Sequence, residues 1–123
     1  MLKRVIKNKT IKSIDVPDYV TSIGKGAFSG CTSLMSISLP FVGAQKEGNE
    51  NTHLGYIFGS SSYDYNDNFV PSSLKTVVIT DGTSIGSYAF YNCDGLTSIT
   101  IPDSVTSIGN YAFSGCSELT SIT

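Results

Sequence analysis

The chain has 123 residues, of which 40% are hydrophobic and 15% charged, and its formal net charge is −2. A chain of this size supports one modest folded domain, and so few charges argue against a nucleic-acid partner. No apolar run approaches the ~20 residues that cross a bilayer, so we expect no membrane insertion, and no signal peptide follows Met1 in the chain as given.

The first twelve residues hold five basic side chains and no acidic one. Leu2, Val5 and Ile6 have the spacing of one helical face, which predicts a short capping helix within residues 1–10 over the end of the core. A basic arm of this kind can bind an acidic surface, whereas the simpler interpretation is a solubilising cap.

Repeated units make up the rest of the chain. Residues 99–116 read ITIPDSVTSIGNYAFSGC, and residues 14–31 repeat them with few changes. A third copy lies 23 residues upstream, where Ala89 and Phe90 correspond to Ala112 and Phe113. A fixed period of this length indicates that each unit buries its apolar side by stacking on its neighbours, as in a solenoid.

Within one unit the apolar residues alternate with polar ones. Ile99 and Ile101 flank Thr100 in the two-residue rhythm of a strand with one buried face. The dipeptide at 102–103, Pro-Asp, favours a turn, and Gly109 is expected to take a positive φ at the next corner. We therefore predict a β-rich repeat solenoid in which each coil adds one parallel strand, with short turns or 3-10 pieces between strands.

The sequence predicts a single domain, residues 1–123, with four coils after the cap. The coils are assigned to residues 11–36, 37–76, 77–98 and 99–121. One buried position of each strand should stack in register, at Ile14, Ile37, Val77 and Ile99. A fresh strand begins at Ile122, and its open edge predicts end-to-end self-association.

The second coil is enlarged, because its strand at Ile37 and the next strand at Val77 lie 40 residues apart instead of about 23. The segment Leu54–Phe58 resembles a shortened copy of residues 23–28, so the extra residues fall at 41–53 and 59–73. Both insertions are rich in Gly, Ser and Asn, which predicts polar surface loops.

The repeated phrase LTSITIPDSVTSIGNYAFSGC, residues 96–116, resembles the leucine-rich repeat of the BspA-like bacterial surface proteins. The resemblance covers residues 11–40 and 74–123 closely and 41–73 loosely. It implies a curved solenoid with a parallel sheet on its concave side. It also implies an adhesin or interaction protein without catalytic activity, at the cell surface or secreted, or carried by a phage. With no signal peptide in the chain as given, we expect either a fragment of a longer protein or a chain from which a leader has been removed.

Three cysteines, Cys31, Cys93 and Cys116, occupy the same place in three coils. A ladder presents its thiols from one direction, whereas structural zinc needs four converging ligands, so we interpret the cysteines as buried core residues. The single histidine, His53, is assigned to an insertion far from these thiols, and no glycine-rich phosphate motif is present. We expect no enzyme activity, metal or cofactor.

One stretch of the second insertion needs a separate test for calcium. Residues 64–68 read D-x-N-x-N, as a calcium loop begins, but the sixth and twelfth positions are Phe69 and Lys75 instead of Gly and Glu. The pattern is therefore not an EF-hand. A looser calcium site on Asp64, Asn66 and Asp67 stays open beside the simpler interpretation of a solvated loop tip.

Two classes of function are left. The first is a protein-interaction or adhesion module that holds a host or bacterial surface protein, and the second is a carbohydrate-binding or purely structural spacer module. Aromatic side chains with polar tips suit protein and sugar partners alike, and we expect Tyr63 and Tyr65 to be exposed. The candidate binding residues are Tyr56, Tyr63, Asp64, Tyr65, Asn66 and Phe69 on the enlarged coil and Ser36, Ser38, Thr76, Val78, Ser98 and Thr100 on the outward face of the strands.

Overall fold

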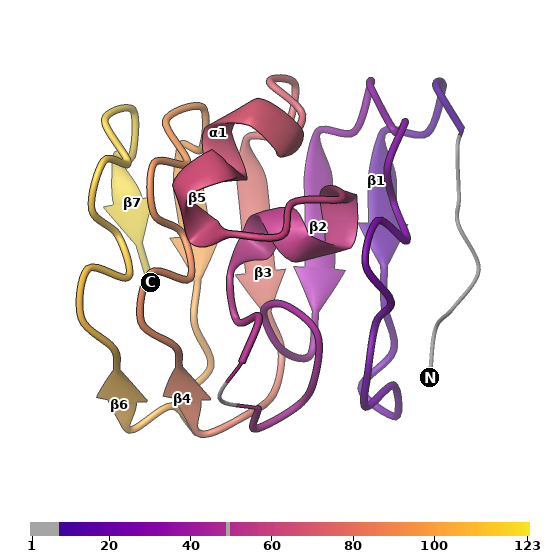
Figure 1. Cartoon of the computed structure of the whole chain (residues 1–123). Coiled ribbons are helices and arrows are strands. Elements are labelled where there is room, and N and C mark those ends of the chain that lie inside the picture. The colour runs from indigo at the N-terminus through magenta and orange to yellow at the C-terminus, as the bar shows by residue number, and fades with distance from the viewer. Residues whose placement is uncertain (1–7, 49) are drawn as a thin grey trace.

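Parallel strands dominate the structure, a computed structural model that describes residues 8–48 and 50–123. The strands form two sheets, and three short helical pieces accompany them (Figure 1). In order, the larger sheet contains β1 (Ser13–Asp15), β2 (Ser36–Leu39), β3 (Thr76–Ile79), β5 (Ser98–Thr100) and β7 (Ser121–Ile122). The smaller sheet contains β4 (Ser84–Ile85) and β6 (Ser107–Ile108), and the helical pieces are η1 (Leu54–Phe58), η2 (Tyr63–Tyr65) and α1 (Asn66–Phe69).

The larger sheet has the register that the repeat predicts. Ile14 pairs with Ile37, Ile37 with Val77, and Val77 with Ile99, all in parallel ladders. Along β2 and β3 every second residue is buried, as expected for strands with one face on the core. The predicted β-rich solenoid and its register are confirmed. The predicted capping helix falls mainly on residues 1–7, which lie outside the described ranges.

Away from the larger sheet, the coils are also joined by backbone hydrogen bonds, and η1 is the part of the second coil that takes part in them. The Phe28 N–H donates to the Ile57 carbonyl, and the Phe90 N–H donates to the Ala112 carbonyl, each at 2.8 Å. Leu54 in turn donates its N–H to the Ala89 carbonyl at 2.8 Å. The segment Leu54–Phe58 therefore fills the level between the first and third coils, as its likeness to residues 23–28 predicts.

The glycines at the corners have a different role from the predicted one. Gly109 does not have a positive φ. At the equivalent corners of the coils, the described residues with positive φ are Gly26, Tyr88 and Tyr111. Gly109 is needed for another reason, because a Cβ there would collide with the backbone of Ser87 on the coil beneath. The prediction of a positive φ at Gly109 is thus wrong, and close contact between coils explains this glycine.

The first insertion is packed onto the solenoid, whereas the second is packed onto it only in part. Phe41 and Val42 are buried in the core. The Ile23 N–H donates to the Ala44 carbonyl at 2.8 Å, and the Lys46 ammonium forms an ion pair with Asp81. The expectation of polar surface loops was therefore wrong for part of the first insertion, because a few apolar residues and the backbone itself fill the space that a regular coil would occupy. In the second insertion it holds for residues 61, 64, 65 and 67–69, which are exposed, but not for the buried Ser60 and Asn66.

β1 and β7 form the two edges of the larger sheet, so end-to-end self-association stays a prediction. Along the described ranges, the helical pieces are far too short and polar to cross a membrane.

The register makes a prediction about stability. Val77 is fully buried between Ile37 and Ile99, whereas the next residue, Val78, lies on the outward face. We expect Val77→Ala to lower the free energy of unfolding by about 2 kcal/mol, since it leaves a cavity in the core, and Val78→Ala to lower it by less than about 1 kcal/mol. Urea denaturation measures both, and equal losses would contradict the assignment of the faces.

Candidate functional site

The candidate residues on the enlarged coil fall into three groups by exposure. Tyr65 and Phe69 expose 51% and 45% of their surface, and Asp64 is also exposed. Tyr56 and Tyr63 are half-buried. The expected exposure thus holds for Tyr65 but not for Tyr63, because the Tyr63 ring packs against tyrosines of the following coil.

Asn66 is fully buried, so its side chain is not available to a partner. Its Oδ1 accepts a hydrogen bond from the Gly55 N–H at 2.8 Å, and its Nδ2 donates to the Tyr91 carbonyl at 2.9 Å. Asn66 therefore joins the insertion to the second and third coils. A Cβ at Gly55 would lie 2.6 Å from that Oδ1, which explains the glycine there.

The same bonds bear on the calcium hypothesis. A carboxamide oxygen that already accepts from a buried backbone N–H is not directed at an ion near Asp64 and Asp67. Within residues 8–48 and 50–123, His, Cys, Asp and Glu side chains form no group of three that could hold a metal.

The sheet candidates do come together on one face. Ser36, Thr76 and Ser98 are consecutive partners in the ladder, and so are Ser38, Val78 and Thr100. All six are partly exposed. They form two short rows of small, mostly hydroxyl-bearing side chains, which offer hydrogen bonds but little contact area.

A column of tyrosines, of which only Tyr63 is among the sequence-based candidates, links the insertion to the last two coils. Tyr63 stacks on Tyr88 with ring centroids 3.9 Å apart, and Tyr88 stacks on Tyr111 at 5.3 Å. Tyr91 meets both Tyr63 and Tyr88 edge to face. Burial, the Asp64 charge and the neighbouring Tyr88 raise the pKa of the Tyr63 phenol. The recurrence of Tyr before Ala89 and Ala112 was the available sequence signal.

Two members of this column adopt an unusual backbone conformation. Tyr88 and Tyr111 have φ values of 60° and 58°, where the first coil has Gly26 at 71°. The left-handed region costs a non-glycine residue on the order of 1 kcal/mol, so such residues persist where their surroundings hold them. The repeat therefore places tyrosines at corners whose conformation favours glycine.

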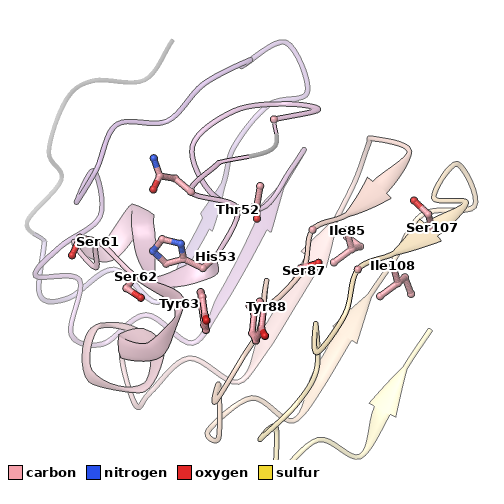
Figure 2. Close-up of a pocket in the computed structure, with 14 residues that line it drawn as sticks. Thr52, His53, Ser61, Ser62, Tyr63, Ile85, Ser87, Tyr88, Ser107 and Ile108 are labelled. Atoms are coloured by element: carbon pink, nitrogen blue, oxygen red, sulfur yellow. The ribbon is translucent and has the colours of Figure 1, made fainter.

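A cavity of about 650 Å³ opens beside the column. Its walls come from residues 48 and 51–53 of the first insertion, residues 61–63 of the second, and the segments 85–88 and 107–109 around β4 and β6. Figure 2 shows Tyr63 and Tyr88 side by side in this cavity, with Ile85 and Ile108 on the neighbouring strands.

His53 is one of the cavity residues, although only 4% of its surface is exposed. Its Nε2 lies 2.9 Å from the Ser60 carbonyl oxygen, so Nε2 carries the hydrogen and Nδ1 is the acceptor nitrogen. Burial lowers the pKa of His53, and the hydrogen bond to Ser60 acts in the opposite direction. The nearby Lys25 charge lowers this pKa further. The imidazole is therefore neutral near pH 7, and the expectation that it belongs to a surface loop is wrong.

The cysteines offer no activated nucleophile. Cys31 and Cys93 are buried, and Cys116 is partly buried with its Sγ donating to the Phe90 carbonyl at 3.1 Å. Burial raises the pKa of Cys93 far above its ordinary value, so this thiol stays protonated near neutral pH.

His53 generates a prediction about pH. Because its pKa is lower in the folded than in the unfolded chain, its contribution to stability is complete above about pH 6.5 and falls as the pH drops toward the folded pKa. His53→Gln keeps an amide donor for Ser60 but does not titrate. Urea unfolding between pH 7.5 and 5.5 should therefore show a smaller loss of stability in the variant, and parallel curves would refute a neutral, buried His53.

Comparison with known proteins gives the family. Six copies of the BspA-type leucine-rich repeat region match residues 3–62 and 65–123. A crystal structure of a leucine-rich repeat protein from Bacteroides ovatus is similar at 34% identity and TM-score 0.53, over 90% of this chain and 24% of that one. A leucine-rich cell surface protein from Faecalibacterium prausnitzii is similar at 26% identity and TM-score 0.51, over 97% of this chain and 33% of that one. No curated protein matches. The chain thus spans a third or less of these two structures, and it belongs to the BspA-type leucine-rich repeat family.

Proposed function

We propose that the chain is a non-catalytic protein-binding module of a bacterial surface or phage-borne protein, and that it acts in adhesion. The observation that carries the proposal is the display of Tyr65 and Phe69 on an insertion that is fixed to the solenoid. The similarity to a protein described as a cell surface protein supports a surface location.

Tyr65 and Phe69 suit a protein partner because large aromatic side chains supply much of the binding energy at interfaces. Both are about half exposed, and the acidic residues Asp64 and Asp67 lie beside them. The buried Asn66 holds this short segment in place from below through its bonds to Gly55 and Tyr91. A fixed aromatic pair loses little conformational freedom on binding, which favours affinity.

The hydroxyl rows of the sheet are a secondary part of the proposed surface. Small side chains such as Ser36 and Ser98 exclude water around an interface but seldom dominate its energy. We therefore place the main contact on the insertion, with the sheet face as the site to test next. The carbohydrate alternative is favoured by a separate observation, the cavity, which is considered below.

The surface can be tested by comparing two variants. Tyr65→Ala combined with Phe69→Ala removes the proposed anchors, and Tyr19→Ala is a matched control because Tyr19 is 84% exposed on the turn after β1. Each protein is immobilised and exposed to solubilised bacterial surface proteins and to extracellular matrix proteins, and mass spectrometry identifies what is captured.

We expect a protein that binds the unchanged chain and the Tyr19 variant, and that binds the double variant with an affinity lower by about 2 to 4 kcal/mol. Thermal stability should change little, since both side chains are half exposed. Equal capture by all three proteins would move the contact to the sheet face, and no saturable capture by any of them would favour a spacer.

A further inference from the structure

The chemistry of the cavity differs from that of the surface around Tyr65. The described residues that line it carry hydroxyl groups, one amide, one imidazole and two isoleucine side chains. None of these lining residues is Lys, Arg, Asp or Glu. An anionic or cationic ligand would find no counter-charge there. A neutral ligand with many hydroxyl groups would find partners that both donate and accept hydrogen bonds.

The apolar part of the lining points to the same class of ligand. Ile108 pairs with the buried Ile85 across β4 and β6 and exposes about half of its own surface. A sugar ring presents C–H groups on its faces and hydroxyls around its edge, so it can contact an isoleucine and the hydroxyl groups of the cavity at once. The volume of about 650 Å³ lies within the range of roughly 300–1,000 Å³ that is usual for small-molecule sites.

The polar groups of the cavity are held in fixed positions. The Tyr63 and Tyr88 rings stack at 3.9 Å, and Tyr91 braces both from the side. Thr52 is packed so closely on the third coil that a Cβ at Gly86 would lie 2.6 Å from its Oγ1. Groups that are already ordered lose little entropy when a ligand arrives, so even weak individual hydrogen bonds add up.

We propose that the cavity between the enlarged second coil and the β4–β6 sheet binds a short neutral oligosaccharide, with the hydroxyls of Tyr63 and Tyr88 bonded to sugar hydroxyls and Ile108 against a sugar ring. This site is separate from the proposed protein-binding anchors, since neither Tyr65 nor Phe69 lines the cavity. The module would then hold a glycan and a protein on different residues.

The test uses isothermal titration calorimetry of the whole chain with a fixed set of ligands. The neutral arm consists of glucan, mannan, galactan and N-acetylglucosamine oligomers, and the charged arm consists of sulfated and sialylated oligomers. An extended neutral peptide of alternating Ser and Val is added, because β4 could also pair with a strand.

The decisive variant is Tyr63→Phe combined with Tyr88→Phe, which keeps both rings and removes both hydroxyls. The matched control is Tyr111→Phe, because Tyr111 belongs to the same column but does not line the cavity. We expect a neutral oligomer to bind the unchanged chain and the control equally. It should bind the double variant roughly tenfold more weakly, the loss expected for two neutral hydrogen bonds. Melting temperatures should agree among the three proteins.

Four outcomes would overturn the proposal. They are binding of the charged arm alone, binding of the peptide in place of the neutral oligomers, an equal loss in the Tyr111 control, and no neutral binding at millimolar concentration. The variant with Ala at positions 65 and 69 separates this site from the proposed function, because it should lose the protein partner and retain the oligosaccharide.

Discussion

Close parallel stacking of one coil on the next is the constraint on which the rest of the structure depends. Neighbouring strands lie about 4.8 Å apart, so each coil must present its backbone and its apolar side chains at fixed positions. Ile37, Val77 and Ile99 meet this requirement in the sheet, and Gly109 meets it at the corner, where the Ser87 backbone leaves no room for a side chain. A coil can vary only where it leaves the stack.

The sequence predicted the regular parts well, because their constraint is local and repeats. Alternation around Ile99 and the 23-residue period were enough to place strands and register. The insertions were misjudged in part because a polar composition does not reveal which residues are buried or hydrogen-bonded to the coils. The residues around Asn66 in the sequence do not indicate that its amide forms hydrogen bonds with both Gly55 and Tyr91, which are 11 and 25 residues away along the chain.

The candidate site was predictable only in part for a related reason. Tyr65 and Phe69 stand out in a loop-like segment, and the structure does expose them. Tyr88 and Tyr111 were overlooked because they sit inside regular repeat units, where each residue has an apparent structural role. Their significance depends on a third ring, Tyr63, which the insertion brings onto the column from outside the repeat.

The enlarged coil and the tyrosine column explain each other. The shortened segment η1 gives the second coil no corner tyrosine in line with Tyr88 and Tyr111, and the second insertion supplies Tyr63 at that level instead. Stacking between aromatic rings contributes about 0.5–1.5 kcal/mol per pair, which is comparable to the strain of a tyrosine at positive φ. Each strained corner is therefore offset by the ring beside it. The cavity lies where both insertions meet the regular coils, so its walls combine residues that leave the repeat with the segments around β4 and β6 that follow it.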